Sequence, residues 1–313
     1  MILARAPLRI PLGGGGTDFP SYYKKFGGMV LGFALDRYVH CIIHDTVDNK
    51  VRLKYSKTEC VNHVDQLENR VAAEALKFHG ITTGIEVATF SDVPESSGLG
   101  GSSAFCVALV TAIRHKLGIP YDKYEIYASA YDIERNKAGQ PGGLQDQFFA
   151  AFGSSWMVDL PKHNCFSMTN VDVKSLVPRL KLVYTGTGRS DLGIAVKQNE
   201  MSEEVIQSLH VTREIGTTVY NCLIEDRLDD IGDIFHKHWE NKKKRSPDIS
   251  NSVVDGLYES LRGCGVRGGK LLGLGGGGYL LIYANGVKFD QDYRLIDVGI
   301  DQEGCKVVYS NGK

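Results

Sequence analysis

Hydrophobic and polar positions along the chain predict strands and helices in a mixed order. Residues 28–55 are rich in β-branched and aromatic side chains, with an interruption at Asp48 and Asn49. This composition predicts antiparallel strands joined as a hairpin. Residues 85–90 alternate between apolar and polar positions, which predicts another strand, and residues 180–185 are also expected to form one.

Helical spacing of apolar residues marks most of the remaining chain. The predicted helices cover residues 65–79, 102–117, 122–137, 195–244 with breaks near Gly216 and Asp229-Asp230, and 250–262. Strands and helices do not alternate regularly, so an α+β fold is favoured over a doubly wound one. A length of 313 residues favours two domains. We expect them at 1–170 and 171–313, because Asn and Pro punctuate residues 165–180.

The charge balance argues against a nucleic-acid-binding protein. The chain has 36 basic and 37 acidic residues, a formal charge of −1, and nucleic-acid binding needs a basic face. The basic run Lys242-Lys243-Lys244-Arg245 is therefore interpreted as a solvated helix end. Any anion site must be local, built from backbone N–H groups and a few cationic side chains.

Cysteine usage and the N-terminus favour a cytoplasmic protein. The seven cysteines form no CxxC pair, which favours reduced thiols over a disulfide framework or a zinc site. His236 and His238 are spaced to lie on different faces of a helix, so no metal site is expected there. The N-terminus lacks a signal-peptide pattern and no run of about 18 apolar residues occurs, so we expect no membrane partner.

Glycine is the unusual residue, with 36 of 313 positions, concentrated in dense clusters. The middle cluster, Pro94 to Ala104, follows a predicted strand and opens the strongest predicted helix. Glycines let backbone approach an anion, and a first helical turn offers free N–H groups, so together they predict a phosphate cradle. Ser102 and Ser103 could touch phosphate or ligate Mg²⁺. The alternative is a plain turn with a serine N-cap.

The first cluster, Gly13 to Gly16, is followed at once by Thr17 and Asp18. Four successive glycines do not suit a packed strand or helix, so they predict a loop that a ligand can approach closely. A hydroxyl and a carboxylate at that point suit the hydroxyl groups of a sugar. Arg9, just upstream, could lie against a transferred phosphate or form a surface ion pair.

Two further segments are less specific. The third cluster, Gly268 to Tyr279, precedes an apolar run and is as consistent with a flexible turn as with a ligand loop. Asp146 begins a predicted helix shortly after Gly143. An acidic residue there is either a helix cap or a carboxylate that accepts a hydroxyl proton.

Three glycine-rich motifs in this order resemble the GHMP kinases, the family of galactokinase, homoserine kinase, mevalonate kinase and phosphomevalonate kinase. The middle motif is similar to the family signature P-x-x-x-G-L-G-S-S-A, with Gly101 as a glycine-for-serine variation. The resemblance implies an N-terminal domain like the second domain of ribosomal protein S5 and a ferredoxin-like C-terminal domain. The active site would lie between them.

The resemblance also implies roles for individual residues, with ATP and Mg²⁺ as cofactors. ATP would be held by Pro94, Gly98, Leu99, Gly100, Gly101, Ser102, Ser103 and Ala104. Mg²⁺ would be held by Ser103 and Glu134, with Ser102 as a substitute. Asp146 would be the base or the orienting carboxylate, and Arg9 would stabilise the hydroxyl or the phosphoryl group. The sugar would contact Gly15, Gly16, Thr17, Asp18, Gly143, Gly276 and Gly277, and the segment Gly273 to Gly278 would close over it.

Departures from the family pattern narrow the substrate. Galactokinases carry Glu-His where this chain has Gly15-Gly16, which disfavours galactose. The motif Gly-Gly-Gly-Thr-Asp and the segment Tyr184 to Ser190 look most like the heptose 7-phosphate kinases of the family, which supply GDP-heptose. That substrate's own phosphate needs a second anion site, for which Arg189 is the first candidate and Lys137 and Arg213 are weaker ones; each is as consistent with a surface charge.

Two alternatives stay open at this point. The first is a fucose kinase-like enzyme or another small-molecule kinase of the same family. The second is a catalytically silent sugar or nucleotide sensor, which is disfavoured because Glu134 and Asp146 are both present. The expected partner is a small sugar phosphate, and a homodimer is left open.

Overall fold

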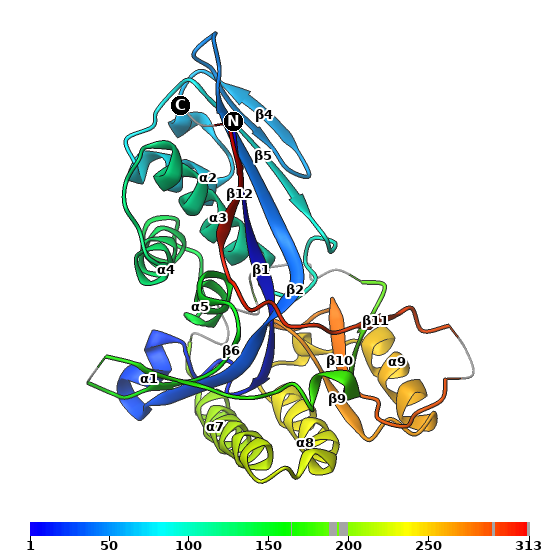
Figure 1. The fold of residues 1–313 in the computed structure, drawn as a ribbon. Helices are drawn as coiled ribbons and strands as arrows, with labels where there is room; N and C mark the ends of the chain where they lie inside the picture. The colour runs from blue at the N-terminus through cyan, green and yellow to red at the C-terminus, as the bar shows by residue number, and fades with distance from the viewer. Residues whose placement is uncertain (164, 188–192, 194–199, 290–291, 312–313) are drawn as a thin grey trace.

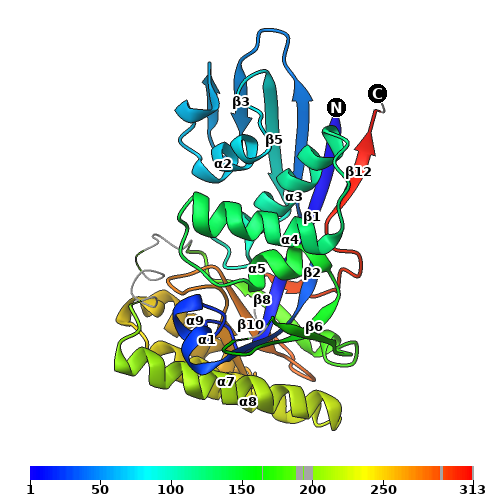
Figure 2. The same ribbon diagram turned by 90° about the vertical axis from the view of Figure 1, so that its left-hand side faces the viewer.

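The computed structural model describes residues 1–163, 165–187, 193, 200–289 and 292–311 of the chain. Two β-sheets organise these residues (Figures 1 and 2). Their helices and strands confirm the expected α+β class. Among the described residues, no helix is both long enough and apolar enough to cross a membrane.

The first sheet is built around two long strands that pair over most of their length. Its order is β12-β1-β2-β5-β3-β4, and β6 extends it by pairing with β2 and with β7. The strands are β1 (Ile2–Gly13), β2 (Gly28–Asp45), β3 (Val51–Lys54), β4 (Thr58–Val61), β5 (Ile85–Ser91), β6 (Ser155–Leu160), β7 (Ser167–Asn170) and β12 (Lys306–Ser310). The first eight residues of β2 are all buried, as expected for a strand covered on both faces.

The predicted hairpin within residues 28–55 is wrong, although its strands exist. β5 lies between β2 and β3, pairing antiparallel with the former and parallel with the latter. The connection that carries the chain from β4 to β5 contains α2 (Arg70–Phe78). A pairing with a strand more than thirty residues downstream leaves no signal in the local pattern that predicted the hairpin.

Helices cover one side of this sheet, where Figure 1 shows α2 to α5. They are α3 (Gly101–Lys116), α4 (Lys123–Tyr131), a π-helical turn (Asp132–Lys137) and α5 (Gln145–Phe152). Other helical segments of the described residues are the short α1 (Pro20–Phe26) and the 3₁₀ turns Val64–Gln66, Val177–Arg179, Leu228–Asp230 and Pro247–Ile249. α3 is the central helix, because residues on nearly all its sides are buried. The predicted helix over 102–117 is therefore confirmed almost to the residue.

The second sheet has the strand order of a ferredoxin-like domain. Its strands are β8 (Leu180–Tyr184), β9 (Gly268–Leu271), β10 (Tyr279–Tyr283) and β11 (Leu295–Asp297). They are antiparallel in the order β11-β8-β10-β9, which is 4-1-3-2 in chain order. Three helices accompany them: α7 (Glu203–Ile224), α8 (Ile231–Lys243) and α9 (Ser252–Gly263).

The predicted break near Gly216 is wrong, because α7 continues through it. A Cβ at this position would lie 2.3 Å from Sδ of Met29 and 2.9 Å from the backbone nitrogen of Gly14. Gly216 therefore lets the helix pack directly against the first glycine cluster. The second predicted break is confirmed, since residues 225–230 separate α7 from α8.

The chain returns to the first sheet at its C-terminal end. β12 pairs antiparallel with β1, so that Ser310 lies opposite Ile2 (Figure 1). Leu182 and Phe235 belong to the same hydrophobic cluster as β1 and β2, so the two sheets share a core. With a boundary at residue 170, all strands of the first sheet except β12 belong to residues 1–170, and all strands of the second sheet belong to residues 171–313. The C-terminal part of the chain therefore contributes its last strand to the first sheet.

Candidate active site

A cleft of about 680 Å³ lies where the three glycine clusters meet. Residues of β1, α3, α5, α8 and β9 line it together with the loops that join these elements. The sequence separates these segments by up to about 260 residues, and the fold gathers them into one concave surface. A single large cleft with converging polar groups is the expected location of a small-molecule site.

The middle cluster forms the start of α3 at one wall of the cleft. Gly100 is the N-cap in a left-handed conformation (φ +82°), and no side chain caps the helix. The alternative of a serine N-cap is therefore wrong. The first turn of this 16-residue helix presents N–H groups and the positive end of the dipole to the cleft, which is a favourable environment for phosphate.

The two serines of this turn bind a buried carboxylate instead. Ser102 Oγ donates to Glu134 Oε1 at 2.9 Å, and Ser103 Oγ donates to Glu134 Oε2 at 2.7 Å. Gln147 Nε2 donates to the same Oε2 at 2.6 Å, while its own Oε1 has no hydrogen-bond partner among the described residues. The structure thus brings the predicted Mg²⁺ ligands together, with an unsatisfied amide oxygen beside them.

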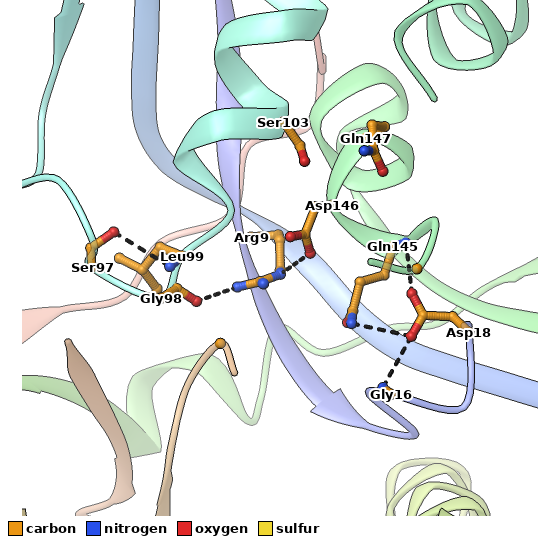
Figure 3. Close-up of polar contacts among 12 residues, drawn as sticks. Arg9, Gly16, Asp18, Ser97, Gly98, Leu99, Ser103, Gln145, Asp146 and Gln147 are labelled. Atoms are coloured by element: carbon orange, nitrogen blue, oxygen red, sulfur yellow. Dashed lines mark hydrogen bonds and ion pairs between the residues drawn. The ribbon is translucent and has the colours of Figure 1, made fainter. Parts of the chain in front are cut away.

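Arg9 and Asp146 meet directly beside the start of α3 (Figure 3), where a Cβ on Gly100 would lie 3.4 Å from each side chain. Arg9 Nε donates to Asp146 Oδ1 at 2.8 Å, and a terminal nitrogen donates to the carbonyl of Gly98 at 2.6 Å. Arg9 is buried, so its ion pair is not a surface one. Asp146 lies in the first turn of α5 without capping it, and its carboxylate is 23% exposed to the cleft.

Asp18 joins the first glycine cluster to the start of α5. It accepts hydrogen bonds from the backbone nitrogens of Gly16 and Gln145, each at 3.0 Å, as Figure 3 shows. Burial raises the pKa of this carboxyl group, and the negative charge of Asp146 raises it further, while the backbone donors oppose that shift. A Cβ on Gly143 would lie 2.0 Å from Asp18 Oδ2, so only glycine fits there.

Other residues of the first and middle clusters lie behind the cleft surface. Thr17 is fully buried, donating to the carbonyls of Gly14 and Met29, so its hydroxyl is occupied by backbone. Leu99 and Ala104 are also fully buried in the core. The remaining predicted residues of these two clusters line the cleft: Gly15, Gly16, Pro94, Gly98, Gly100, Gly101, Ser102 and Ser103.

The third cluster contacts the middle one through backbone. A Cβ on Gly273 would lie 2.7 Å from Cα of Gly98, so the two chains approach as closely as glycines allow. Gly273 lines the cleft, whereas the predicted substrate residues Gly276 and Gly277 contact Ile249 and Thr187 and are not among its lining residues.

The interpretation of residues 242–245 as a solvated helix end is wrong for two of its four members. Lys242 and Arg245 are buried and line the cleft, together with Lys270 and His238. A sequence signal for this was present. His238, Lys242 and Arg245 recur at i, i+4 and i+7, which continues the buried face of α8.

Two of the three predicted candidates for a second anion site do not line the cleft, and the third lies outside the described residues. Lys137 is exposed and paired with Asp132, and Arg213 donates to the carbonyl of Phe26; neither lines the cleft. Arg189 lies outside the described residues, so its role stays a prediction.

Comparisons with known proteins agree with this geometry. Residues 62–154 match the GHMP kinases N terminal domain. The chain is 29% identical to D-glycero-alpha-D-manno-heptose 7-phosphate kinase of Campylobacter jejuni, over 97% of this chain and 94% of the relative. It is 24% identical to the bifunctional fucokinase/GDP-fucose pyrophosphorylase of Arabidopsis thaliana, over 92% of this chain and 30% of the relative.

A solved structure, a D-glycero-D-manno-heptose 1-phosphate kinase from Bacteroides thetaiotaomicron, has the same fold. It superposes with a TM-score of 0.78 at 22% identity, covering 99% of this chain and all of the other. The chain therefore contains a match to the GHMP kinases N terminal domain and has the α+β fold of this solved structure. Its similarity to the heptose 7-phosphate kinase of Campylobacter jejuni extends over nearly the whole of both chains.

Proposed function

We propose that the protein transfers the γ-phosphoryl group of ATP to the anomeric hydroxyl of D-glycero-D-manno-heptose 7-phosphate. The product would be the 1,7-bisphosphate used to make GDP-heptose. The observation that carries the proposal is that the uncapped start of α3 and the Arg9–Asp146 pair face the same cleft. The start of α3 suits a triphosphate, and the Arg9–Asp146 pair suits an alcohol that loses its proton.

The nucleotide's phosphates would lie against the first turn of α3. Backbone N–H groups there neutralise negative charge without moving, because the helix already holds them in place. Arg9 adds a fixed positive charge beside the carbonyl of Gly98. Phosphoryl transfer depends mainly on such positioning and charge stabilisation, with little covalent chemistry for the protein to perform.

The residues near Glu134 fit a hard divalent cation. Its carboxylate and the hydroxyls of Ser102 and Ser103 are oxygen donors of the kind that Mg²⁺ prefers, and Gln147 Oε1 is unsatisfied beside them. These groups would hold Mg²⁺ together with the nucleotide, and the ion would supply charge neutralisation on the phosphates. Ser102 and Ser103 would give up their present bonds to Glu134 in part.

Asp146 would accept the proton of the acceptor hydroxyl. The hydroxyl oxygen forms a bond to the γ-phosphorus, the bond from that phosphorus to the β–γ bridging oxygen breaks, and ADP leaves. Arg9 holds the carboxylate in place through Nε. Asp18 would act indirectly, by positioning Asp146, because it fixes the start of α5 through the backbone nitrogen of Gln145.

The heptose assignment is supported by the relative in Campylobacter jejuni, and the fucokinase relative supplies the main competitor. A coupled assay of ADP release with heptose 7-phosphate, galactose, fucose and mannose tests the choice. Phosphorus NMR of the product then places the new phosphate. Turnover confined to heptose 7-phosphate, with the phosphate at the anomeric position, supports the proposal, whereas a preference for fucose refutes it.

A further inference from the structure

Three cationic side chains gather in the wall of the cleft that α8 and β9 build. Lys242 lies in the last turn of α8, Arg245 lies two residues after the end of that helix, and Lys270 lies in β9. We name Lys242, Arg245 and Lys270 the cation cluster. Each is at most 7% exposed, which is rare for Lys and Arg. The run of basic residues includes Lys244 as well, but that side chain is exposed.

Neutral groups hold Arg245 and Lys270 in place. Lys270 Nζ donates to the carbonyl of Leu12 at 2.7 Å and approaches Nδ1 of His238 at 3.2 Å. Arg245 Nε donates to Ser208 Oγ at 3.0 Å. Within the described parts of the chain, no carboxylate forms an ion pair with Arg245 or Lys270.

Burying Arg245 and Lys270 without a counter-ion is unfavourable. Burial lowers the pKa of Lys270 far below its ordinary value, and the neighbouring charges of Lys242, Arg245 and Arg9 lower it further. Burial likewise lowers the pKa of Arg245 to about 10. A structure that needed only packing at these positions would be better served by apolar side chains. The arrangement therefore points to an anion that enters from the cleft.

The cluster is placed to meet the acceptor rather than the nucleotide. Arg245 lies alongside the first glycine cluster, since a Cβ on Gly16 would be 3.0 Å from its terminal nitrogen. The same nitrogen reaches the carbonyl of Gly15 at 3.5 Å. Lys270 is tied to Leu12, the residue just before that cluster. The phosphate cradle at the start of α3 is a separate structural element of the cleft.

We propose that the cation cluster binds a phosphate group carried by the acceptor substrate, and so selects phosphorylated sugars over free ones. This inference rests on the proposed kinase activity. It replaces Lys137 and Arg213 as candidates for the second anion site with residues that line the cleft. Lys242, Arg245 and Lys270 line the same cleft, and charge-assisted hydrogen bonds from such cationic donors favour the oxygens of a phosphate monoester.

The test compares two acceptors and three variants. Arg245→Met and Lys270→Met each remove one charge of the cluster, and Lys244→Met removes a neighbouring exposed charge as the matched control. Each is assayed for ADP release with heptose 7-phosphate and with unphosphorylated heptose. We expect the two cluster variants to raise the KM for the sugar phosphate roughly 10- to 100-fold, the size of a lost charge-assisted hydrogen bond. The KM for ATP and turnover of free heptose should change less than about threefold.

Calorimetric titration of heptose 7-phosphate without nucleotide provides a second readout that does not need turnover. Wild type and Lys244→Met should bind it, and the two cluster variants should bind it roughly 10- to 100-fold more weakly. Circular dichroism identifies any variant that fails to fold. If one cluster variant fails to fold, the binding measured with the other cluster variant tests the inference. The inference is overturned if the cluster variants lose activity equally with heptose 7-phosphate and with free heptose. It is also overturned if they raise the KM for ATP rather than the KM for the sugar phosphate. Wild-type binding without turnover of any sugar would overturn the kinase proposal and leave the anion site supported.

Discussion

Replacing Asp146 by Asn removes one negative charge and leaves the shape of the side chain almost unchanged. The amide oxygen can still accept from Arg9 Nε, the bond that is 2.8 Å long in the present structure. The bond stays charge-assisted through the guanidinium, but the attraction between two opposite charges is lost. The loss of stability should be about 1–2 kcal/mol, since hydrogen bonds to charged groups contribute roughly 1.5–3 kcal/mol.

This loss is too small to unfold the protein, because a domain is typically stable by about 5–15 kcal/mol. Removing the proton acceptor should lower kcat by roughly 10²–10⁴. That corresponds to about 3–5 kcal/mol in the barrier, so loss of activity and loss of stability can be told apart.

Coupled ADP release measures kcat, calorimetry measures nucleotide affinity, and urea unfolding measures stability. The matched control is Asp297→Asn, which alters an exposed carboxylate paired with Lys181 and should leave kcat within about twofold. Nucleotide affinity should be largely kept in Asp146→Asn. A kcat close to that of wild type would remove Asp146 from the mechanism. A fall in ATP affinity that matches the fall in kcat would show that Asp146 shapes the nucleotide site instead.

Three further predictions concern packing and charge. Gly216→Ala should lower the free energy of unfolding by about 1–3 kcal/mol through overpacking. Gly256→Ala is the control, because the space around this helix position is open, and it should raise the free energy of unfolding by up to about 1 kcal/mol. Equal urea midpoints for the two variants would refute this contrast. Because the pKa of Lys270 is lowered in the folded protein, the unfolded chain binds more protons between that pKa and 10.5, so stability rises with pH in this window. Lys270→Met should be more stable than wild type at neutral pH, and its free energy of unfolding should depend less on pH. A fall in the free energy of unfolding by more than about 2 kcal/mol would indicate a structural role for Lys270. Gly143→Ala should displace Asp18 and reduce kcat with stability lowered by about 1–3 kcal/mol, and unchanged kinetics would show that this contact does not position the site.

The sequence predicted the helix over 102–117 well because two signals agree there. Apolar residues repeat at helical spacing, and glycines mark both ends. The same agreement predicts a phosphate cradle at Gly98 to Ser103. The side-chain partners could not be predicted in this way, since Ser102 and Ser103 are bound to Glu134, a residue more than thirty positions away.

The sequence failed where long-range contacts decide the outcome. The hairpin within 28–55 was wrong because β5 inserts between β2 and β3. The basic run predicts solvated side chains for Lys242 and Arg245, because charged residues near a helix end usually are solvated. Lys242 is buried where it donates to the carbonyls of Leu271 and Gly273. Arg245 is buried against α7, where it donates to Ser208 and Thr212.

The close contacts between glycine clusters give these residues a role that composition does not show. Glycine-rich loops are usually read as flexible or as ligand-binding, yet Gly98 meets Gly273, and Gly13 meets Gly216, at distances that exclude any side chain. The backbone of one domain is therefore packed directly on that of the other at the edge of the cleft. Because packed backbone resists displacement, the start of α3, Arg9 and the cation cluster are held at fixed separations before a ligand arrives. Such preorganisation is what a phosphoryl-transfer site requires, since its catalysis depends on positioned charge.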